Sequence, residues 1–598
     1  MNSPPRIAGD EMIAVGFDVG NGTCTISTVR QGVVDVLLID EPALISFSDK
    51  QRFIGSSASS LLYPSSTFSD IKDLLLSQPR SQYRVWFLKK EITFTPVHLL
   101  GMLLSRLKLI AERSLGVPVS DCVISLPSYA DQFGRGAYLQ AFKIAGLKPL
   151  RLIHDTTATA LGYGIYKTDF YNCEILVFVD VGHCGTQVSV VVFKSSGLRV
   201  LSHAADRRLG GRDFDEILFK HFSKQFEDEY QIDVSSNAKA SIRLKAECEK
   251  VKKVLSANAE ASMSIECLMD DKDVKGFIKR EEFEKLASGL LDRLLLPCEN
   301  ALSDAGFVVD EVQSVELIGS ASGIPAITRI LSSFFGKEPS RTLDVRECVA
   351  RGCALQCAML ACGVKIKNYQ VHDLLPHSLR FELDSGWIRN NQVLLKGAFF
   401  PTVKVVNVPV RGGFSHLSAS SIHTDENGQP LDGSQIIDTF FSCSLPLEVD
   451  SQVKGRPWSR LDRPIDMYFR GALDCSELVS AGLLEMQLAD QDKLVERIKD
   501  RKNELQALVN EFSGNFLERY RRFATETERM AIFISVEQSQ EVLCVEGVDL
   551  TENVYNSELL KLKKLLEPIV NRFKDEEARP QATRELVQCI VDNKLAVE

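Results

Sequence analysis

The sequence lacks an excess of positive charge: 70 lysines and arginines stand against 80 aspartates and glutamates, a net charge of −10. A surface that binds nucleic acid through its phosphates needs the opposite balance, so we expect no nucleic-acid partner. No stretch approaches the roughly 18 uninterrupted apolar residues of a membrane span, so we expect no membrane partner either. The first residues carry no apolar segment of the kind found in secretion signals, and we expect no such leader.

Paired cysteines at zinc-binding spacing are also lacking, although the chain has 15 cysteines. Many of them, such as Cys122, Cys173 and Cys298, lie within apolar runs, which is typical of reduced, buried thiols. We therefore expect a cytoplasmic protein, possibly also nuclear. A denser group follows a spacing of five, four and five, which favours small residues on a packed helix over a zinc site; its members are Cys348, Cys353, Cys357 and Cys362.

What the sequence does contain is one pattern that occurs twice. Residues 13–27 and 175–190 each read as an apolar strand, an Asp-Val-Gly turn and a second strand, with Asp18 and Asp180 at the turns. Glycine at such a turn lets backbone N–H groups approach an anion, and the aspartate can hold a divalent cation through water. Two such hairpins facing each other would hold a metal-bound polyphosphate. The alternative is that both are ordinary Asp-Gly hairpin turns.

Five further features occupy positions at which α/β proteins bind ligands. Lys72 lies near the start of a predicted short helix, and Asp155 lies at a strand end before a helix, where ligands bind in such folds. The glycine pair Gly210 and Gly211 precedes a helix, as in phosphate sites. A basic helix at 239–256 and a small-residue loop after the strand at 315 complete the set. The alternatives are a solvated helix face and a plain strand-to-helix connection.

The length of 598 residues is too great for one core, so two to four domains are expected. We predict a domain at 1–370, a linker at 371–377, a β-rich domain at 378–483 and a helical bundle or lid at 484–598. The clearest strand of the β-rich domain is predicted at 403–410. An apolar stripe marks the helical part, formed by Leu494, Ile498, Leu505, Leu508, Phe512 and Phe516.

Together these features resemble the heat-shock chaperone superfamily of actin-like ATPases. The motifs that carry the resemblance are Val15-Gly-Phe-Asp-Val-Gly-Asn, residues 150–167, Asp180-Val-Gly-His, Leu209-Gly-Gly-Arg-Asp-Phe-Asp-Glu, residues 249–258 and Arg351-Gly-Cys-Ala-Leu-Gln-Cys-Ala. Asn21 after the first Asp-Val-Gly and His183 after the second favour the large, 110-kilodalton-type branch, and the chain looks closest to plant cytosolic members. The resemblance is strong over residues 13–370, moderate in the helical tail and weak over 410–480. It implies an α/β actin-like two-lobed ATPase domain, followed by a β-rich domain and a C-terminal helical domain.

The resemblance also implies a role for each matching residue, with ATP or ADP and Mg as ligands. Asp18 and Asp180 would order the waters of Mg, and Lys72 and Asp155 would act at the γ-phosphate and the attacking water. The residues that would form the two phosphate loops are Gly20, Asn21, Gly22, Thr23, Gly182 and His183, and Gly210 and Gly211 would back the phosphates. Those that would contact adenosine are Glu249, Lys252, Lys253, Ser256, Gly319 and Ser320.

Several departures from the family pattern predict weak or absent hydrolysis. Asp155 stands where the family usually has a glutamate, and Gln187 replaces an aspartate on the metal side. Asn21 and Gly22 replace hydroxyl donors, and Gly323 replaces an arginine that would lie over the adenine. The segment between Lys72 and Pro127 and the β-rich region are both shorter than the pattern.

Four functions follow as hypotheses. The first is a co-chaperone that binds ATP and acts as a nucleotide exchange factor for an ordinary heat-shock chaperone, in protein folding and the stress response. The second is an autonomous ATP-hydrolysing chaperone that also binds unfolded polypeptides. The third is a small-molecule kinase of the same fold, for which the helical tail has no evident use. The fourth is a degenerate relic that binds neither nucleotide nor partner.

Overall fold

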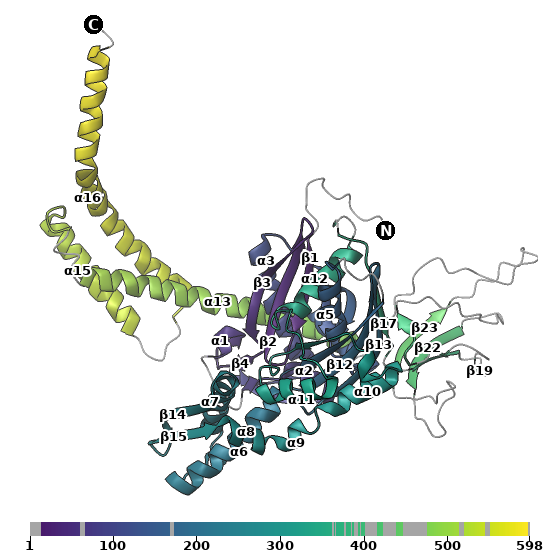
Figure 1. Cartoon of the computed structure of the whole chain (residues 1–598). Coiled ribbons are helices and arrows are strands. Elements are labelled where there is room, and N and C mark those ends of the chain that lie inside the picture. Colours follow the sequence, from purple (N-terminus) through teal and green to yellow (C-terminus); the bar gives the residue numbers. More distant parts are fainter. Residues whose placement is uncertain are drawn as a thin grey trace, which may run out of the picture. The chain divides into compact units, whose positions relative to one another are not determined.

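The computed structural model describes most of the chain in detail (Figure 1). The described residues are 13–59, 66–167, 173–361, 364, 366–375, 378–383, 386–387, 393–394, 396–400, 415–422, 438–445, 475–513, 520–544 and 550–595. The chain divides into two compact units, Met1–Glu485 and Met486–Glu598. The division into four parts expected from the sequence stays a prediction.

The first lobe of the first unit is built on a five-stranded sheet in the order β10-β9-β1-β2-β3. β1, β2 and β3 form an antiparallel meander, and β9 and β10 add to it in parallel. The strands are β1 (Ala14–Val19), β2 (Thr23–Arg30), β3 (Val33–Pro42), β9 (Asp121–Leu126) and β10 (Lys148–His154). β1 is buried almost throughout, as its apolar run predicts.

The second lobe repeats this arrangement with a six-stranded sheet in the order β16-β11-β12-β13-β17-β21. β11, β12 and β13 form the antiparallel meander, and β16 is parallel to β11 as β9 is to β1. The strands are β11 (Glu174–Val181), β12 (Thr186–Lys194), β13 (Gly197–Asp206), β16 (Ser314–Ile318), β17 (Gln370–Leu374) and β21 (Phe399–Phe400). The structure confirms the repeated hairpin expected from the sequence.

Two helices, α5 (Asp155–Gly164) and α12 (Cys348–Leu360), share a core with strands of both sheets. α12 passes so close to β1 and α5 that glycine is required at two contacts. A Cβ on Gly16 would lie 2.1 Å from the backbone nitrogen of Ala354, and one on Gly352 would lie 1.9 Å from the carbonyl oxygen of Ala158. Three members of the dense cysteine group, Cys348, Cys353 and Cys357, are buried on α12, while Cys362 lies outside the described residues.

The remaining elements of the first lobe flank its sheet, and α3 has both a start and a stop signal in its own sequence. Thr95 and His98 form a capping box at its start, Pro96 occupies the first turn, and Gly116 ends it at φ 71°. The elements are β4 (Ile45–Phe47), β5 (Arg52–Ile54), α1 (Ser56–Ser59), β6 (Thr67–Phe68), α2 (Ile71–Ser77), β7 (Tyr83–Phe87), β8 (Lys90–Phe94), α3 (Pro96–Leu115) and α4 (Gln132–Ile144).

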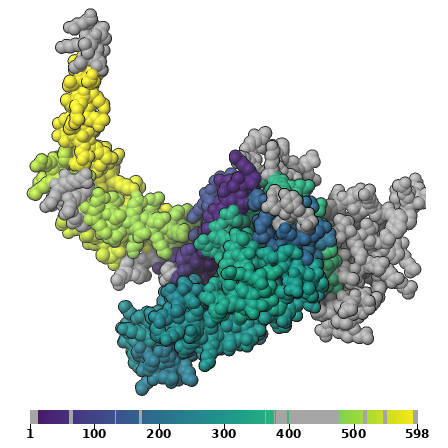
Figure 2. All heavy atoms as spheres, viewed as in Figure 1, coloured from purple at the N-terminus to yellow at the C-terminus, as the bar shows by residue number. Residues whose placement is uncertain are grey.

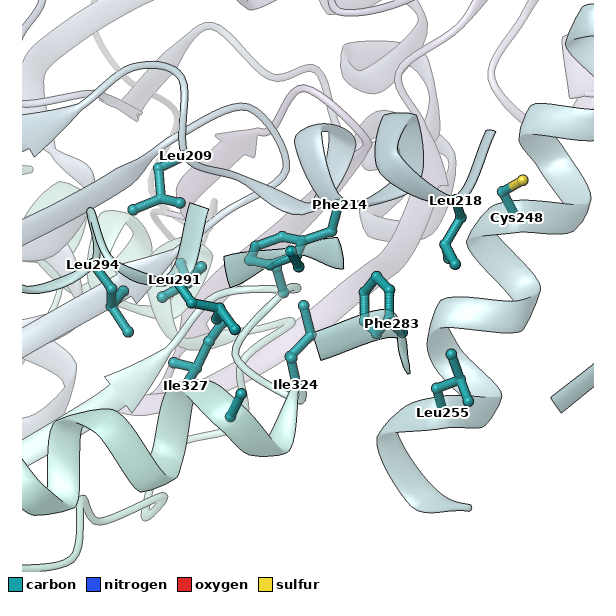
Figure 3. Close-up of a cluster of buried hydrophobic side chains, with 14 of the residues drawn as sticks. Leu209, Phe214, Leu218, Cys248, Leu255, Phe283, Leu291, Leu294, Ile324 and Ile327 are labelled. Carbon is teal, nitrogen blue, oxygen red and sulfur yellow. The ribbon is translucent and has the colours of Figure 1, made fainter. Parts of the chain in front are cut away.

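The second lobe has its own apolar core, which includes Phe214, Leu218, Phe283, Ile327 and Leu255 of the basic helix (Figure 3). Residues of this lobe, in teal, make up much of the first unit's surface in Figure 2. Its outer elements are α6 (Gly211–Tyr230), η1 (Val234–Ser236), α7 (Ala238–Ala257), β14 (Glu260–Met269), β15 (Lys272–Lys279), α8 (Arg280–Leu286), α9 (Ser288–Leu291), α10 (Leu295–Ala305), η2 (Val309–Glu311) and α11 (Pro325–Phe335).

Residues 370–374, at the start of the expected linker, form β17, which pairs in parallel with Gly197–Arg199 of β13. Beyond it the described part of the β-rich region contains β18 (Ser378–Leu383), β19 (Gly386–Trp387), β20 (Val393–Leu394), β22 (Ser415–Ile422) and β23 (Asp438–Leu445). The strand expected at 403–410 lies outside the described residues.

The second unit is helical, with α15 (Glu526–Cys544), α16 (Glu552–Leu595) and the greater part of α13 (Cys475–Ser513). Leu505 and Phe512 of the predicted stripe are buried, and Ile498 and Leu508 pack against them. Leu494 is 36% exposed, so the stripe begins later than predicted, and Phe516 lies outside the described residues.

Within the described chain, no helix combines the length and the apolar character that a membrane crossing requires.

Candidate functional site

The two repeated hairpins open onto one cavity of about 610 Å³, a size typical of small-molecule sites. Residues from both lobes line it. Those predicted from the sequence are Asp18, Gly20, Asn21, Gly22, Thr23, Lys72, Asp155, Asp180, Gly182, His183, Glu249, Lys252, Lys253, Ser256, Gly319 and Ser320. Gly210 and Gly211 are the two predicted site residues that do not line the cavity.

Asp18 and Asp180 are the next-to-last residues of the first strand of each hairpin, and both line the cavity. Burial, opposed by the nearby Lys72 ammonium, raises the pKa of Asp18 to about 6. Burial, together with the charges of Asp155 and Asp18, raises the pKa of Asp180 to about 7. Ser125, which sequence analysis missed, donates a hydrogen bond of 3.2 Å to Asp18. Two partly desolvated carboxylates that lack a full countercharge suit a hydrated divalent cation.

Asp180→Asn is expected to stabilise the nucleotide-free protein at pH 8 by about 1–3 kcal/mol, because it removes a desolvated charge. The carboxyl has an ordinary pKa of 3.8 and a folded pKa of about 7. Its destabilising effect is therefore absent below the lower value and complete above the higher one. Thermal unfolding from pH 5 to 8 should show the advantage of the variant grow with pH. An advantage that is equal at both ends would contradict this account.

Lys72 and Asp155 form a buried ion pair between α2 and the start of α5. The Lys72 ammonium lies 3.2 and 3.4 Å from the two carboxylate oxygens. Burial alone would lower the pKa of Lys72, but the charges around it, Asp155 foremost, raise it above its ordinary value. Gln187 then donates a hydrogen bond of 3.1 Å to Asp155, while its amide oxygen accepts from the backbone N–H of Ser128 at 2.7 Å. Both ends of the Gln187 amide are thus engaged, and Asp155 is bound on two sides.

The first phosphate loop spans Gly20 to Thr23. Its turn closes with a hydrogen bond of 3.0 Å from Gly20 N–H to the Thr23 carbonyl, and the second loop repeats the bond from Gly182 to Gly185 at 2.9 Å. Asn21 lines the cavity, but its side-chain amide oxygen already has a partner within the protein. Its amide oxygen accepts from the backbone N–H of Asp73 at 2.8 Å and so caps the helix that carries Lys72.

Gly210 and Gly211 lie behind the second phosphate loop. Gly211 N–H donates to the Gly182 carbonyl at 2.9 Å, and Gly210 N–H donates to the Asp213 carboxylate at 2.8 Å. A Cβ on Gly210 would lie 2.5 Å from both His183 and Gly185 backbone atoms. The N–H groups of both glycines are therefore already bonded, and the pair supports the loop from behind; that they back the phosphates stays a prediction.

The α7 residues expected at adenosine line the cavity, but three of them, Glu249, Lys252 and Lys253, are paired within the protein. The Lys252 ammonium donates to the Asp215 carboxylate at 2.6 Å and to the Gly211 carbonyl at 2.9 Å, while Lys253 pairs with Glu249 at 2.7 Å. Gly319 has φ 90°, and a Cβ there would lie 2.4 Å from Asp180, so this position requires glycine.

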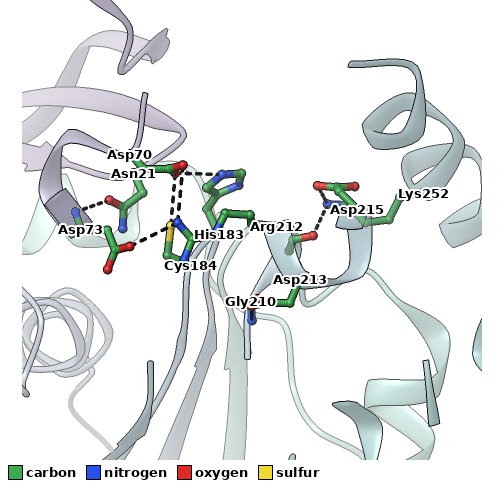
Figure 4. Close-up of polar contacts among 11 residues, drawn as sticks. Asn21, Asp70, Asp73, His183, Cys184, Gly210, Arg212, Asp213, Asp215 and Lys252 are labelled. Atoms are coloured by element: carbon green, nitrogen blue, oxygen red, sulfur yellow. Dashed lines mark hydrogen bonds and ion pairs between the residues drawn. The ribbon is translucent and has the colours of Figure 1, made fainter. Parts of the chain in front are cut away.

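Polar contacts across the cleft form a group that sequence analysis missed (Figure 4). Asp70, just before α2, lies 3.2 Å from His183 Nε2 and 3.4 Å from Arg212 Nη1. Arg212 also lies 3.2 Å from the Asp73 carboxylate. Burial opposes ionisation, but the His183 and Arg212 contacts lower the pKa of Asp70 below its ordinary value. The sequence signal was slight: Asp70 and Asp73 flank Lys72.

The residue before Asp155 is connected to β17. His154 Nδ1 lies 3.0 Å from one oxygen of Asp373, and His203 Nε2 lies 2.9 Å from the other. The Arg135 guanidinium contacts His154 Nε2. Because a guanidinium only donates, Nε2 must accept and the ring proton resides on Nδ1, facing Asp373. Burial lowers the pKa of His154 to about 4, so this imidazole is neutral.

The residues present fit the nucleotide and Mg that the resemblance implies. Asp18 and Asp180 supply the oxygen groups that Mg prefers, directly or through water. The two glycine turns bring backbone close to the cavity, and Gly323 leaves open space, with its nearest neighbour, Ser256 Oγ, 3.7 Å from a Cβ built there. The cavity is large enough for a nucleotide.

Comparison with known proteins shows the family of this chain. The family model for HSP70 (Hsp70 protein) matches residues 14–404. Heat shock 70 kDa protein 16 of Arabidopsis thaliana is 43% identical, over 98% of this chain and 89% of its own length. Heat shock 70 kDa protein 14 of the same plant is 37% identical, over 97% of this chain and 86% of its own length.

Heat shock 70 kDa protein 4 of Homo sapiens is 31% identical, over 96% of this chain and 84% of its own length. The alignment with the first Arabidopsis protein spans 678 positions, more than the 598 residues of this chain, so that relative carries segments that are absent here. Family membership implies nucleotide binding and supports a chaperone role. The chain belongs to the Hsp70 family, in its large, 110-kilodalton-type branch, and has the actin-like ATPase fold of that family.

Proposed function

We propose that this chaperone is a nucleotide exchange factor for an ordinary Hsp70 and that it uses ATP as a structural ligand. The observation that carries the proposal is the state of Asp155. Its carboxylate is paired with Lys72 and accepts a hydrogen bond from Gln187, whose own amide is fixed by Ser128. A carboxylate held in this way is poorly placed to orient an attacking water, although the cavity around it remains suited to binding.

ATP with Mg would supply a polyanion and a cation between the two hairpins. Asp18 of β1 and Asp180 of β11 would hold the cation through water, and the turns at Gly20 and Gly182 would face the phosphates. Each hairpin belongs to a different lobe, so a ligand held by both would favour one relative position of the lobes. Tight binding of this kind stabilises a protein by several kcal/mol without turnover.

The partner would be the nucleotide-binding domain of an ordinary Hsp70, and unfolded polypeptides are possible clients. We propose the cytoplasm as its location, with the nucleus as a second one. This proposal rests on its free cysteines, of which Cys122 and Cys298 are buried as expected, whereas Cys173 is exposed.

The test is release of fluorescent ADP from an ordinary Hsp70. With Mg-ATP present, the full chain is expected to lower the partner's affinity for ADP by roughly 5–150-fold. Lys72→Ala is expected to keep this activity, because hydrolysis is not needed, whereas Asp18→Ala is expected to lose it together with the ATP-dependent rise in melting temperature.

Two outcomes would overturn the proposal. The first is a wild-type chain that is stabilised by Mg-ATP and yet leaves ADP release unchanged. The second is exchange that disappears in Lys72→Ala while ATP binding persists, which would instead favour an autonomous chaperone driven by hydrolysis.

A further inference from the structure

Three potential metal ligands of different chemistry converge where the two lobes face each other (Figure 4). Asp70 comes from the first lobe, just before α2, while His183 and Cys184 come from the second phosphate loop, between β11 and β12. The Asp70 Oδ1 atom lies 3.2 Å from His183 Nε2 and 3.2 Å from Cys184 Sγ. These three atoms all lie within 4.8 Å of one another.

We infer that Asp70, His183 and Cys184 form a zinc site that joins the two lobes of the nucleotide-binding domain. Zinc accepts carboxylate, imidazole and thiolate ligands, with bond lengths of about 2.0–2.3 Å in a tetrahedral arrangement. That geometry separates neighbouring ligand atoms by roughly 3.3–3.5 Å, close to the two 3.2 Å distances. Three protein ligands leave the fourth position to water.

The ligands are held in place by their neighbours. Arg212 lies 3.4 Å from Oδ2 of Asp70, which leaves Oδ1 turned toward His183 and Cys184. The loop that carries the histidine and the cysteine is fixed by backbone hydrogen bonds, from Gly182 N–H to the Gly185 carbonyl at 2.9 Å and from Arg212 N–H to the His183 carbonyl at 2.8 Å. Outer contacts of this kind orient the ligands of metal sites.

This site differs in chemistry from the Mg position expected at Asp18 and Asp180. Mg prefers oxygen ligands and keeps much of its water, so a thiolate and an imidazole select zinc against it. A zinc ion here would connect α2, which carries Lys72, to the loop opposite it. The zinc ion would join the two lobes whether or not the protein hydrolyses ATP or acts as an exchange factor. The inference therefore does not depend on the proposed function.

The test is cobalt substitution in the full-length, metal-free protein. Titration with Co²⁺ is expected to produce the near-ultraviolet band of a cobalt–thiolate bond, and Zn²⁺ should displace it. Cys184→Ser is expected to lose the band, and Asp70→Asn, which keeps every thiol, should weaken Co²⁺ binding by at least about 10-fold. Cys267→Ser is the matched control, because it removes an exposed thiol of the same lobe, and the band should persist.

The inference is overturned if the wild type gives no cobalt–thiolate band, or if the band is unchanged in Cys184→Ser and Asp70→Asn. The three residues would then form only a hydrogen-bonded contact between the lobes. A cooperative melting transition of each metal-free variant would show that the variant is folded. If one variant does not fold, the other still tests the site.

Discussion

Bound Mg-ATP is expected to be hydrolysed roughly 10²–10³-fold more slowly by this protein than by an ordinary Hsp70, the loss typical of one missing transition-state contact. The reason is local to Asp155. Its carboxylate lies 3.2 Å from the Lys72 ammonium and 3.1 Å from the Gln187 amide, and aspartate is one methylene shorter than the glutamate of the family pattern. Single-turnover measurements with excess protein would isolate the chemical step from product release.

Variants can restore the missing groups. Asp155→Glu combined with Gln187→Asp lengthens the first carboxylate and returns an acidic side chain to the metal side. This double variant is expected to hydrolyse ATP at least about 10-fold faster than the wild type. Adding Lys72→Ala should abolish the gain, which ties it to this site. A wild type as fast as an ordinary Hsp70 would show that Asp155 is not restrained in solution.

Gly352→Ala is expected to destabilise the protein by roughly 3 kcal/mol or more, a large effect for one methyl group. The added Cβ would lie 1.9 Å from the Ala158 carbonyl oxygen, so the backbones of α12 and α5 would have to separate. These helices share a core with both sheets, and the separation would disturb both lobes. Chemical denaturation of the full chain would measure the loss.

Gly162→Ala provides a matched control at the same helix pair. There the added Cβ would lie 3.6 Å from the Cys348 carbonyl oxygen, an ordinary contact. Alanine also favours a helix over glycine by up to about 1 kcal/mol, so this variant is expected to be neutral or slightly stabilising. Equal losses for the two variants would mean that close approach at Gly352 is not the cause.

The parts of the fold that could be predicted are those coded by neighbouring residues. The hairpins at Asp18 and Asp180, the capped helix α3 and the strand before Asp155 all follow from local apolar periodicity and turn residues. The shared cavity could be predicted as well, because two copies of one ligand-binding hairpin suggest that both copies face the same ligand. The family resemblance then assigned roles that spacing alone could not.

The parts that could not be predicted depend on contacts between distant residues. Gln187 was recognised as a departure, but its bonds to Ser128 and Asp155 cross 59 and 32 residues of sequence. Asn21 was expected at phosphate, and it caps a helix 52 residues away. Gly210 and Gly211 fit a phosphate-binding pattern, but only the fold shows that their N–H groups are already bonded.

Strand β17 determines how much of the chain is needed to complete the second lobe. Without it, β13 would present unpaired N–H and C=O groups over Gly197–Arg199, an exposed edge that other chains can pair with. Leu375 continues the connection through hydrogen bonds of 3.0 and 2.9 Å with Ala398 and Gly397. A nucleotide-binding fragment that ends at residue 370 would therefore have an exposed, aggregation-prone sheet edge, whereas one that continues to about residue 400 would keep that edge covered. The boundary expected at residue 370 thus lies at the start of the strand that covers this edge, β17.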